Sequence, residues 1–124
     1  MTAGLWLYAV CRPWIVALPA LAVQRVAPLD DLGGLEVTPL SRLLGLPPSP
    51  IGAAAVVAGP HGPRALGVER CLQVAALPPG GLTIPPAALR QRRLTACFPI
   101  TLPAVPEGLA PFGLVLDASA WMAA

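Results

Sequence analysis

The sequence predicts a mainly β fold made of two similar subdomains, and two observations predict it. One segment occurs twice: residues 17–29 read ALPALAVQRVAPL and residues 65–77 read ALGVERCLQVAAL, which agree at five positions without a gap. Short apolar runs with strand character also alternate with turns rich in proline and glycine along most of the chain. Two copies of a strand–turn–strand unit indicate small barrels or a sandwich with few, short helices.

Length and composition favour one domain, residues 1–124, with a covered surface. Hydrophobic residues make up 56% of the chain and charged residues 11%, which is more apolar than an ordinary protein surface. The longest uncharged run, 43–63, contains five prolines and therefore does not form a membrane-spanning helix. We therefore expect a protein partner rather than membrane insertion. No basic residue precedes the apolar N-terminal stretch, so we expect no secretory signal and a cytoplasmic location.

The N-terminal half is expected to hold four strands, at residues 5–11, 14–18, 20–27 and 35–40. Residues 5–11 are apolar at both odd and even positions, which predicts a strand covered on both faces. Pro19 is expected to interrupt its ladder at an edge or a bulge. Ser41 is expected to cap a brief helical turn that stops near Gly45.

The C-terminal half is expected to hold four more strands, at residues 52–58, 65–77, 94–102 and 112–116. A stiff proline-rich connector precedes them, and we expect the seam between the subdomains near residues 47–51. Residues 59–63 are expected to form a hairpin loop. Short helical turns are expected at 87–93 and at 118–122, the latter capped by Asp117.

Cysteine and histidine usage predicts no catalytic, metal or cofactor site. Cys11, Cys71 and Cys97 are odd in number and widely spaced, so we expect reduced thiols, and the lone His61 does not complete a metal site with them. A nucleophilic cysteine with His61 as base and Asp117 as orienting group would need all three to converge, and their spacing does not indicate it. We therefore expect no enzyme.

Charge does not indicate a nucleic-acid partner either. The formal net charge is only +2, and the single basic cluster, residues 90–93, has no interleaved aromatic residue. We interpret that cluster as the solvated face of a short helix.

Four segments share, in order, features of one family. Residues 15–26 carry Pro19, Val23 and Val26 at characteristic spacing, and residues 37–45 end in Leu-Leu-Gly. Residues 67–74 place Glu69 at an acidic position, and residues 113–121 read GLVLDASAW. This order resembles the CheW-like domain, the coupling module of bacterial chemosensory systems. The resemblance implies two five-stranded SH3-like barrels packed together.

The departures from that family are concentrated in one region. The family has a sizeable loop and a strand with an Asn-Leu-Arg-Gly motif between the valine segment and the next strand, and only residues 27–34 stand here. Pro39 also stands where the family has an aspartate. We therefore expect the first barrel to be shortened and incomplete.

The resemblance implies a non-catalytic adaptor that couples a histidine kinase or another signalling protein to chemoreceptors or other partners. Two alternatives stay open: a diverged scaffold or localisation factor outside receptor arrays, and an unrelated small β enzyme.

The shortened region is the expected partner surface, because a lost segment leaves sheet edges or apolar surface uncovered. Such an edge invites strand addition or self-association, unless the turn at Asp30-Asp31 folds over and seals it. We expect Arg25→Glu and Leu32→Asp to weaken binding without changing stability. The expected contacts are Val23, Arg25, Leu32, Gly33 and Gly34, with Glu69 and Arg70 on the other barrel.

Overall fold

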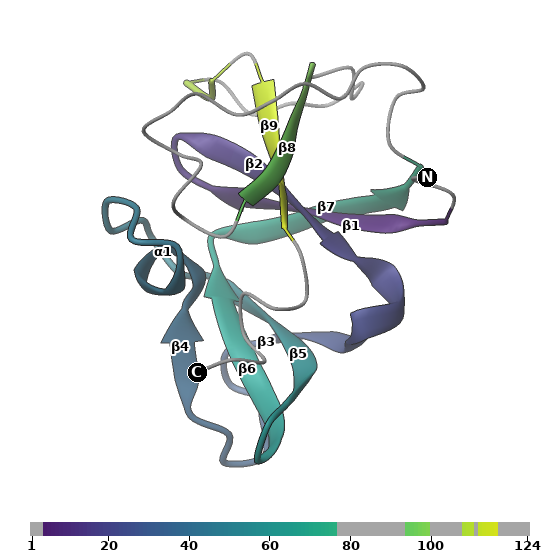
Figure 1. Ribbon diagram of the computed structural model, residues 1–124. Coiled ribbons are helices and arrows are strands. Elements are labelled where there is room, and N and C mark those ends of the chain that lie inside the picture. Colours follow the sequence, from purple (N-terminus) through teal and green to yellow (C-terminus); the bar gives the residue numbers. More distant parts are fainter. Residues whose placement is uncertain (1–3, 77–93, 100–107, 111, 117–124) are drawn as a thin grey trace.

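The chain forms a mainly β structure of two sheets, as the sequence predicts. The computed structural model describes residues 4–76, 94–99, 108–110 and 112–116 (Figure 1). The described part contains nine strands and only two short helical segments. In the view of Figure 1, one sheet forms the upper half of the molecule and the other forms the lower half. No helix in the described ranges has the length and apolar character needed to cross a bilayer.

The first sheet has five strands in the order β7-β1-β2-β9-β8. Strands β1 and β2 form a hairpin, and β9 pairs with β2 in parallel. The expected pairing of the last two strands is confirmed, since β8 and β9 are antiparallel neighbours. The bounds are Trp6–Cys11 for β1, Trp14–Pro19 for β2, Arg70–Ala75 for β7, Leu94–Pro99 for β8 and Phe112–Leu116 for β9.

The second sheet has four strands in the order β3-β5-β6-β4. Its hairpin, β5 and β6, turns tightly at Pro60 and His61, because Gly59 already pairs with Gly62. Strand β4 pairs with β6 in parallel. The bounds are Val23–Pro28 for β3, Val37–Pro39 for β4, Ala53–Gly59 for β5 and Gly62–Val68 for β6.

The two sheets share one connectivity. In each, an edge strand pairs antiparallel with the first strand of a hairpin, and the hairpin's second strand has a parallel neighbour. Strands β7, β1, β2 and β9 thus correspond to β3, β5, β6 and β4. Among the described strands, β8 has no counterpart in the second sheet, so the subdomain that holds residues 27–34 has four strands instead of five.

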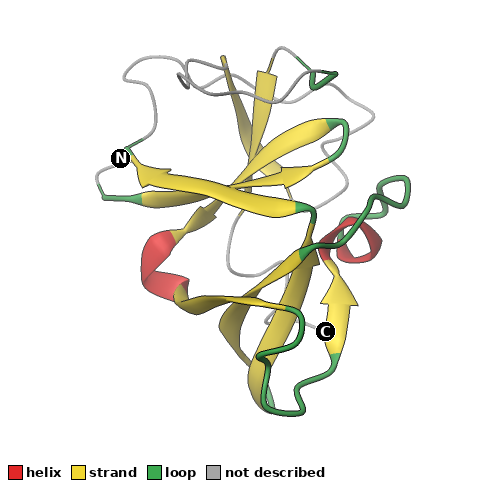
Figure 2. Ribbon diagram, turned by 180° about the vertical axis from the view of Figure 1, so that it is seen from behind, coloured by secondary structure: helices red, strands yellow, loops and turns green. Residues whose placement is uncertain are grey.

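The repeated segments occupy equivalent places in this arrangement. Residues 17–29 carry the chain from β2 in the first sheet, through η1 (Ala20–Ala22), into β3 of the second (Figure 2). Residues 65–76 carry it back from β6 to β7, with a break at Glu69 that divides the single strand expected over 65–77. Residues 47–51, where we expected the seam, connect α1 (Leu40–Leu43) to β5, and the chain does not change sheets there.

The main core lies between the two sheets, and this explains the doubly apolar pattern of β1. Leu7, Ala9 and Cys11 point from β1 into the cluster shared with the second sheet. Tyr8 points to the opposite face and packs with Ile15, Ala17 and Val115. The prediction that this strand is covered on both faces is confirmed.

The helical turn near Ser41 is present, but its expected cap is wrong. Pro39 precedes the first helical residue, no side chain caps the helix, and Ser41 lies inside it, 4% exposed. The helix begins at Leu40, directly after Pro39, so Ser41 lies one residue inside the helix and past the position from which a side chain caps it. The expected helices at 87–93 and 118–122, with Asp117, lie outside the described residues.

Candidate partner-binding surface

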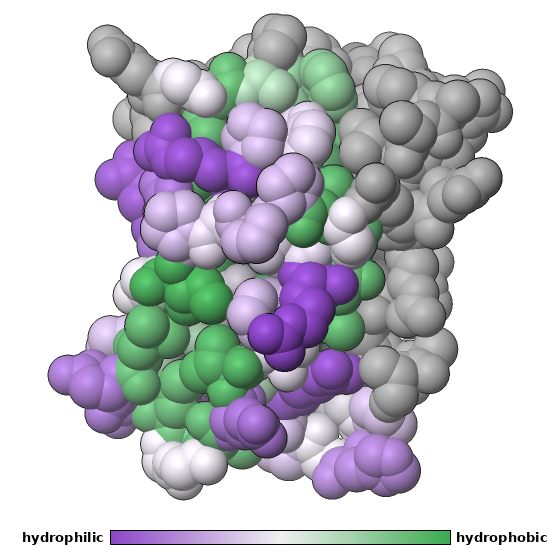
Figure 3. All heavy atoms as spheres, turned by 90° about the vertical axis from the view of Figure 1, so that its left-hand side faces the viewer, coloured by the Kyte–Doolittle hydropathy of each residue, from purple (hydrophilic) through white to green (hydrophobic). Residues whose placement is uncertain are grey.

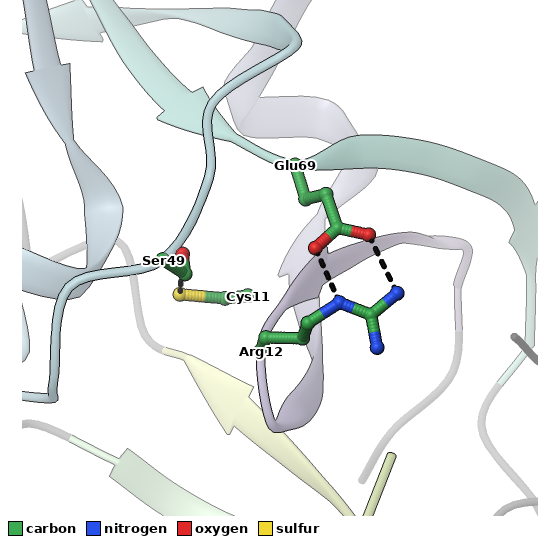
Figure 4. A network of polar contacts seen from close by, with 4 residues as sticks. All are labelled: Cys11, Arg12, Ser49 and Glu69. Atoms are coloured by element: carbon green, nitrogen blue, oxygen red, sulfur yellow. Dashed lines mark hydrogen bonds and ion pairs between the residues drawn. The ribbon is translucent and has the colours of Figure 1, made fainter. Parts of the chain in front are cut away.

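A bidentate ion pair joins Arg12, in the β1–β2 turn, to Glu69, where the chain crosses from β6 in the second sheet to β7 in the first (Figure 4). We call the segment 65–76 the second crossing. Arg12 donates from Nε to Glu69 Oε1 at 2.6 Å and from Nη2 to Glu69 Oε2 at 3.0 Å. The hydrogen bonds that Arg12 donates to Glu69, together with the negative charge of that carboxylate, raise the pKa of the Arg12 guanidinium. The backbone N–H of Glu69 also donates to the carbonyl of Val10 at 2.9 Å. Glu69 is therefore held within the chain by three hydrogen bonds.

A sulfhydryl lies beside this ion pair, but its surroundings oppose reactivity. Cys11 Sγ is 3.8 Å from Ser49 Oγ, and the cysteine is fully buried. Burial raises the pKa of the Cys11 thiol, and burial also raises that of Cys71. A thiol with a raised pKa carries less thiolate at neutral pH, which is the nucleophilic form.

The structure does not bring the alternative catalytic residues together where it describes them. His61 lies at the tip of the β5–β6 hairpin in the second sheet, whereas Cys71 lies on β7 in the first. The residues described hold no group of three histidine, cysteine, aspartate or glutamate side chains that would bind a metal. The side chains of Cys97 and Asp117 are outside the description.

The reactivity of the thiols should reflect how deeply Cys11 and Cys71 are buried. Cys11 and Cys71 are free. We expect the unfolded, unreduced protein to titrate as three thiols per chain, because the sequence contains three cysteines. In the folded protein, Cys71 should react with a thiol reagent faster than Cys11, because Cys71 is only half-buried. Both rates should rise with pH, since their raised pKa values keep the thiolate scarce at neutral pH. Fewer than three thiols after unfolding would contradict the expectation.

The shortened segment between β3 and β4 places its expected contact residues in three different environments. Arg25 is exposed, and its Nη1 donates to the carbonyl of Asp31 at 3.1 Å. Gly33 and Gly34 are exposed in a turn, with φ values of +61° and +89° that favour glycine. Val23 is half-buried and packs against the main core. These four residues do not form one continuous apolar surface.

The prediction that Leu32 lies on a poorly covered surface is wrong. It is only 5% exposed and packs in a small cluster on the outer face of the second sheet. The cluster is Ala27, Leu32, Ala54, Val56 and Ala65. The short turn after β3 folds back and places Leu32 over the small side chains of this face. Within the described part of the chain, no other helix or sheet covers these side chains.

The apolar character of this outer face is visible at the surface. Figure 3 shows hydrophobic residues gathered over the lower half of the molecule, where the second sheet lies. Leu35 and Val37 pack at its border, half-buried. Val37 and Ile51 also close over Gly67, where a Cβ atom would lie within 3.0 Å of their side chains. On this outer face of the second sheet, the larger side chains of Leu32, Val37 and Ile51 therefore cover alanine and glycine residues of the strands.

A second apolar surface was not predicted from the sequence. Leu5 is 58% exposed, Leu21 is 104% exposed and Val74 is 51% exposed. Leu5 and Leu21 line one hollow, and Ala20 N donates to Leu5 O; Val74 lies on β7, the strand that pairs with the other side of β1. We call these three residues the apolar end. Leu5 and Leu21 help to line a surface hollow of about 420 Å³, whose described lining carries no charged residue: Gly4, Leu5, Trp6, Pro19, Ala20 and Leu21.

Leu21 illustrates why this surface was missed. The run 20–22 is apolar and continues a strand pattern, so the sequence favours a buried strand there. In the structure the run is a short 3-10 turn that crosses between the sheets, and Leu21 projects outward from it. Pro19 immediately before it is the one local signal that the strand ends.

Comparisons with known proteins agree with this geometry at the level of the fold. No family model and no curated protein matches the sequence. A solved structure, scaffolding protein TtCheW from Thermoanaerobacter tengcongensis, superposes with a TM-score of 0.63 over 93% of this chain and 84% of that chain. The fold is CheW-like. The sequence identity is 9%, so the likeness establishes architecture and leaves function to be argued from the surface.

Proposed function

We propose that the chain is a non-catalytic adaptor that couples a histidine kinase or another signalling protein to chemoreceptors or other partners in a bacterial chemosensory pathway. The CheW-like fold supports this assignment, because the structural neighbour is a scaffolding protein. The raised pKa values of buried Cys11 and half-buried Cys71 make both thiols weak candidates for a nucleophile, which favours a binding role over catalysis. On this proposal the protein acts in the cytoplasm, without a cofactor.

The apolar end is the observation that carries the proposal. Exposed large apolar side chains that lie together, without charge among them, are typical of protein-binding surfaces. Leu21 is fully exposed on a turn between the two sheets, where a partner can contact both subdomains. Of the contacts predicted from the sequence, Arg25, Gly33, Gly34 and Arg70 are exposed and stay proposed contacts, as does half-buried Val23. The Glu69 carboxylate forms an ion pair with Arg12 of the same chain.

Leu21→Asp should therefore weaken partner capture without affecting folding. Leu21 loses no packing when it is replaced, since it is fully exposed, and a surface change of this kind alters stability by no more than about 0.5 kcal/mol. The measurement is a pull-down of the histidine kinase and chemoreceptors with the wild-type chain and the variant, beside thermal melts. We expect severalfold less capture by the variant.

Ala58→Asp is the matched control, because it adds the same charge at an exposed site near the tip of the β5–β6 hairpin. Capture by this control should equal that of the wild type. Equal capture by the wild type and Leu21→Asp would contradict a binding role for the apolar end. No capture of kinase or receptor by the wild type would contradict coupling.

A diverged scaffold or localisation factor outside receptor arrays is the second candidate. The second sheet, with four described strands, favours it, because the resemblance implies that the shortened region, residues 27–34, belongs to the part that contacts kinase and receptors. Reproducible co-purification of other proteins, with kinase and receptors absent, would support this candidate over coupling.

A further inference from the structure

Strand β7 contains one residue more than the stretch of β1 that it faces. Residues 6–10 of β1 pair with five of the six residues of β7. The register shifts directly after Tyr8: Tyr8 faces Gln73, whereas the next residue of β1 faces Cys71. Leu72, between these two, has no partner on β1. Leu72 therefore forms a β-bulge, which changes the face to which the following side chains point.

The bulge decides which face of the first sheet carries Val74. With the bulge in place, Val74 pairs with Leu7, whose side chain points into the main core between the sheets. Val74 therefore lies on that face, where it is 51% exposed and belongs to the apolar end. Without the bulge, the C-terminal half of β7 would move by one residue. Val74 would then pair with Trp6 and point to the opposite face, where Trp6 packs.

Packing alone does not select the bulged register. No residue of β7 is fully buried, so no core side chain fixes the position of this strand along β1. In the regular register, Leu72 would face Tyr8 and stay in the cluster that it already contacts. Only the small side chain of Ala75 would leave that cluster, while Val74 would gain cover from Trp6. A specific contact is therefore needed to hold the bulge.

The hydroxyl of Tyr8 supplies such a contact just beyond the end of β7. Tyr8 Oη donates to the carbonyl of Ala76 at 2.9 Å. The Tyr8 side chain is 2% exposed and packs with Ile15, Ala17 and Val115, which fixes its position. Burial raises the pKa of the Tyr8 hydroxyl, which therefore keeps the proton that it donates. A slip of β7 into the regular register would carry the Ala76 carbonyl about 3.3 Å further away, beyond hydrogen-bond distance.

We propose that Tyr8 is a positioning residue for the partner surface: its hydroxyl holds the end of β7 in the bulged register and so keeps Val74 in the apolar end. The consequence for partner binding rests on the function proposed above. Arg12 holds the other end of β7 through Glu69, on the far side of the bulge from Val74. The two contacts thus confine Leu72, the extra residue, between them.

Tyr8→Phe tests this role in the purified chain. The variant loses the hydroxyl and keeps the buried ring, so it should stay folded, which thermal melts check. Cross-strand contacts measured by NMR should change: those between residues 7 and 74 should weaken, and contacts between residues 6 and 74 should appear. Amide hydrogen exchange over residues 73–75 should become about tenfold faster. In a pull-down, the variant should capture severalfold less kinase or receptor than the wild type.

Two control variants make the result specific. Thr38→Val removes a hydroxyl from a half-buried position of β4 in the second sheet, and it should leave the contacts and the exchange of β7 unchanged. Arg12→Met removes the contact on the other side of the bulge. In this variant Val74 should still pair with Leu7, because the hydrogen bond from Tyr8 to Ala76 remains.

Two outcomes would overturn the positioning role of Tyr8: wild-type contacts and exchange in Tyr8→Phe, or equally fast exchange over residues 73–75 in Arg12→Met. A changed register with unchanged capture would overturn the link between Tyr8 and binding. The NMR and exchange measurements need no partner. Their outcome is therefore distinct from a failure of the wild type to capture kinase or receptors, which would contradict the proposed function.

Discussion

Replacing Leu32 by aspartate should destabilise the protein strongly, instead of removing a partner contact as the sequence suggested. Leu32 is 5% exposed against Ala27, Ala54, Val56 and Ala65. No basic side chain belongs to this cluster, so the new carboxylate would be buried without a partner. A buried unpaired charge costs about 3–5 kcal/mol, a large part of the stability of a small domain. We expect the melting temperature to fall by about 10 °C or more.

Two substitutions define the interpretation of that result. Leu29→Asp adds the same group at a site in the same turn that is 41% exposed, and it should change the melting temperature little. Leu32→Ala removes the packing without adding a charge and should cost about 2–4 kcal/mol. A melting curve for Leu32→Asp that matches the wild type would show that Leu32 lies at the surface after all.

Replacing Gly52 by alanine should also destabilise the fold, because the backbone passes very close to the second crossing there. A Cβ atom at Gly52 would lie 2.6 Å from the carbonyl oxygen of Glu69. The backbone is held in place by a hydrogen bond of 2.9 Å from Gly52 N to Val68 O. Relief of the clash requires a backbone shift at the point where Arg12 and Glu69 join the sheets. We expect a loss of about 1–3 kcal/mol in urea or thermal unfolding.

Gly33→Ala separates crowding from backbone conformation in that experiment. At Gly33 no atom lies within 4 Å of the added Cβ, but φ is +61°, which disfavours residues other than glycine. This variant should lose only about 1 kcal/mol. If Gly52→Ala were no less stable than Gly33→Ala, the close approach at Gly52 would not constrain the fold.

The local pattern of apolar residues was sufficient to predict the burial of a strand whose two faces are both covered. The run 6–11 is apolar at every position, so its burial on both faces followed whichever way the strand is turned, whereas Leu5 just before it is 58% exposed. Proline and glycine restrict or extend the backbone locally, and the hairpin turn at Pro60 and His61 was predicted for that reason. The strand expected over 65–77 was wrong in its continuity, because the break at Glu69 arises where the chain leaves one sheet for the other.

The candidate site was harder to predict, because exposure depends on neighbours that are distant in sequence. Leu21 lies in an apolar run and Leu32 stands between Asp31 and Gly33, yet Leu21 is 104% exposed and Leu32 only 5% exposed. Leu32 is covered because the turn folds back onto alanines of β3, β5 and β6. Leu21 is exposed because η1 leads the chain from one sheet to the other and has no layer over it in the described residues.

The sequence by itself determined the fold class, the positions of most strands and turns, and the paired crossing segments at 17–29 and 65–77. It did so because strand patterning, proline and glycine act over a few residues. Only the tertiary structure decided which sheet each strand joins, that Glu69 binds Arg12 across 57 residues of sequence, and which strands lie at the edges of the second sheet. These outcomes depend on packing between segments far apart in the chain, and a local pattern carries no information about which distant surface will cover it.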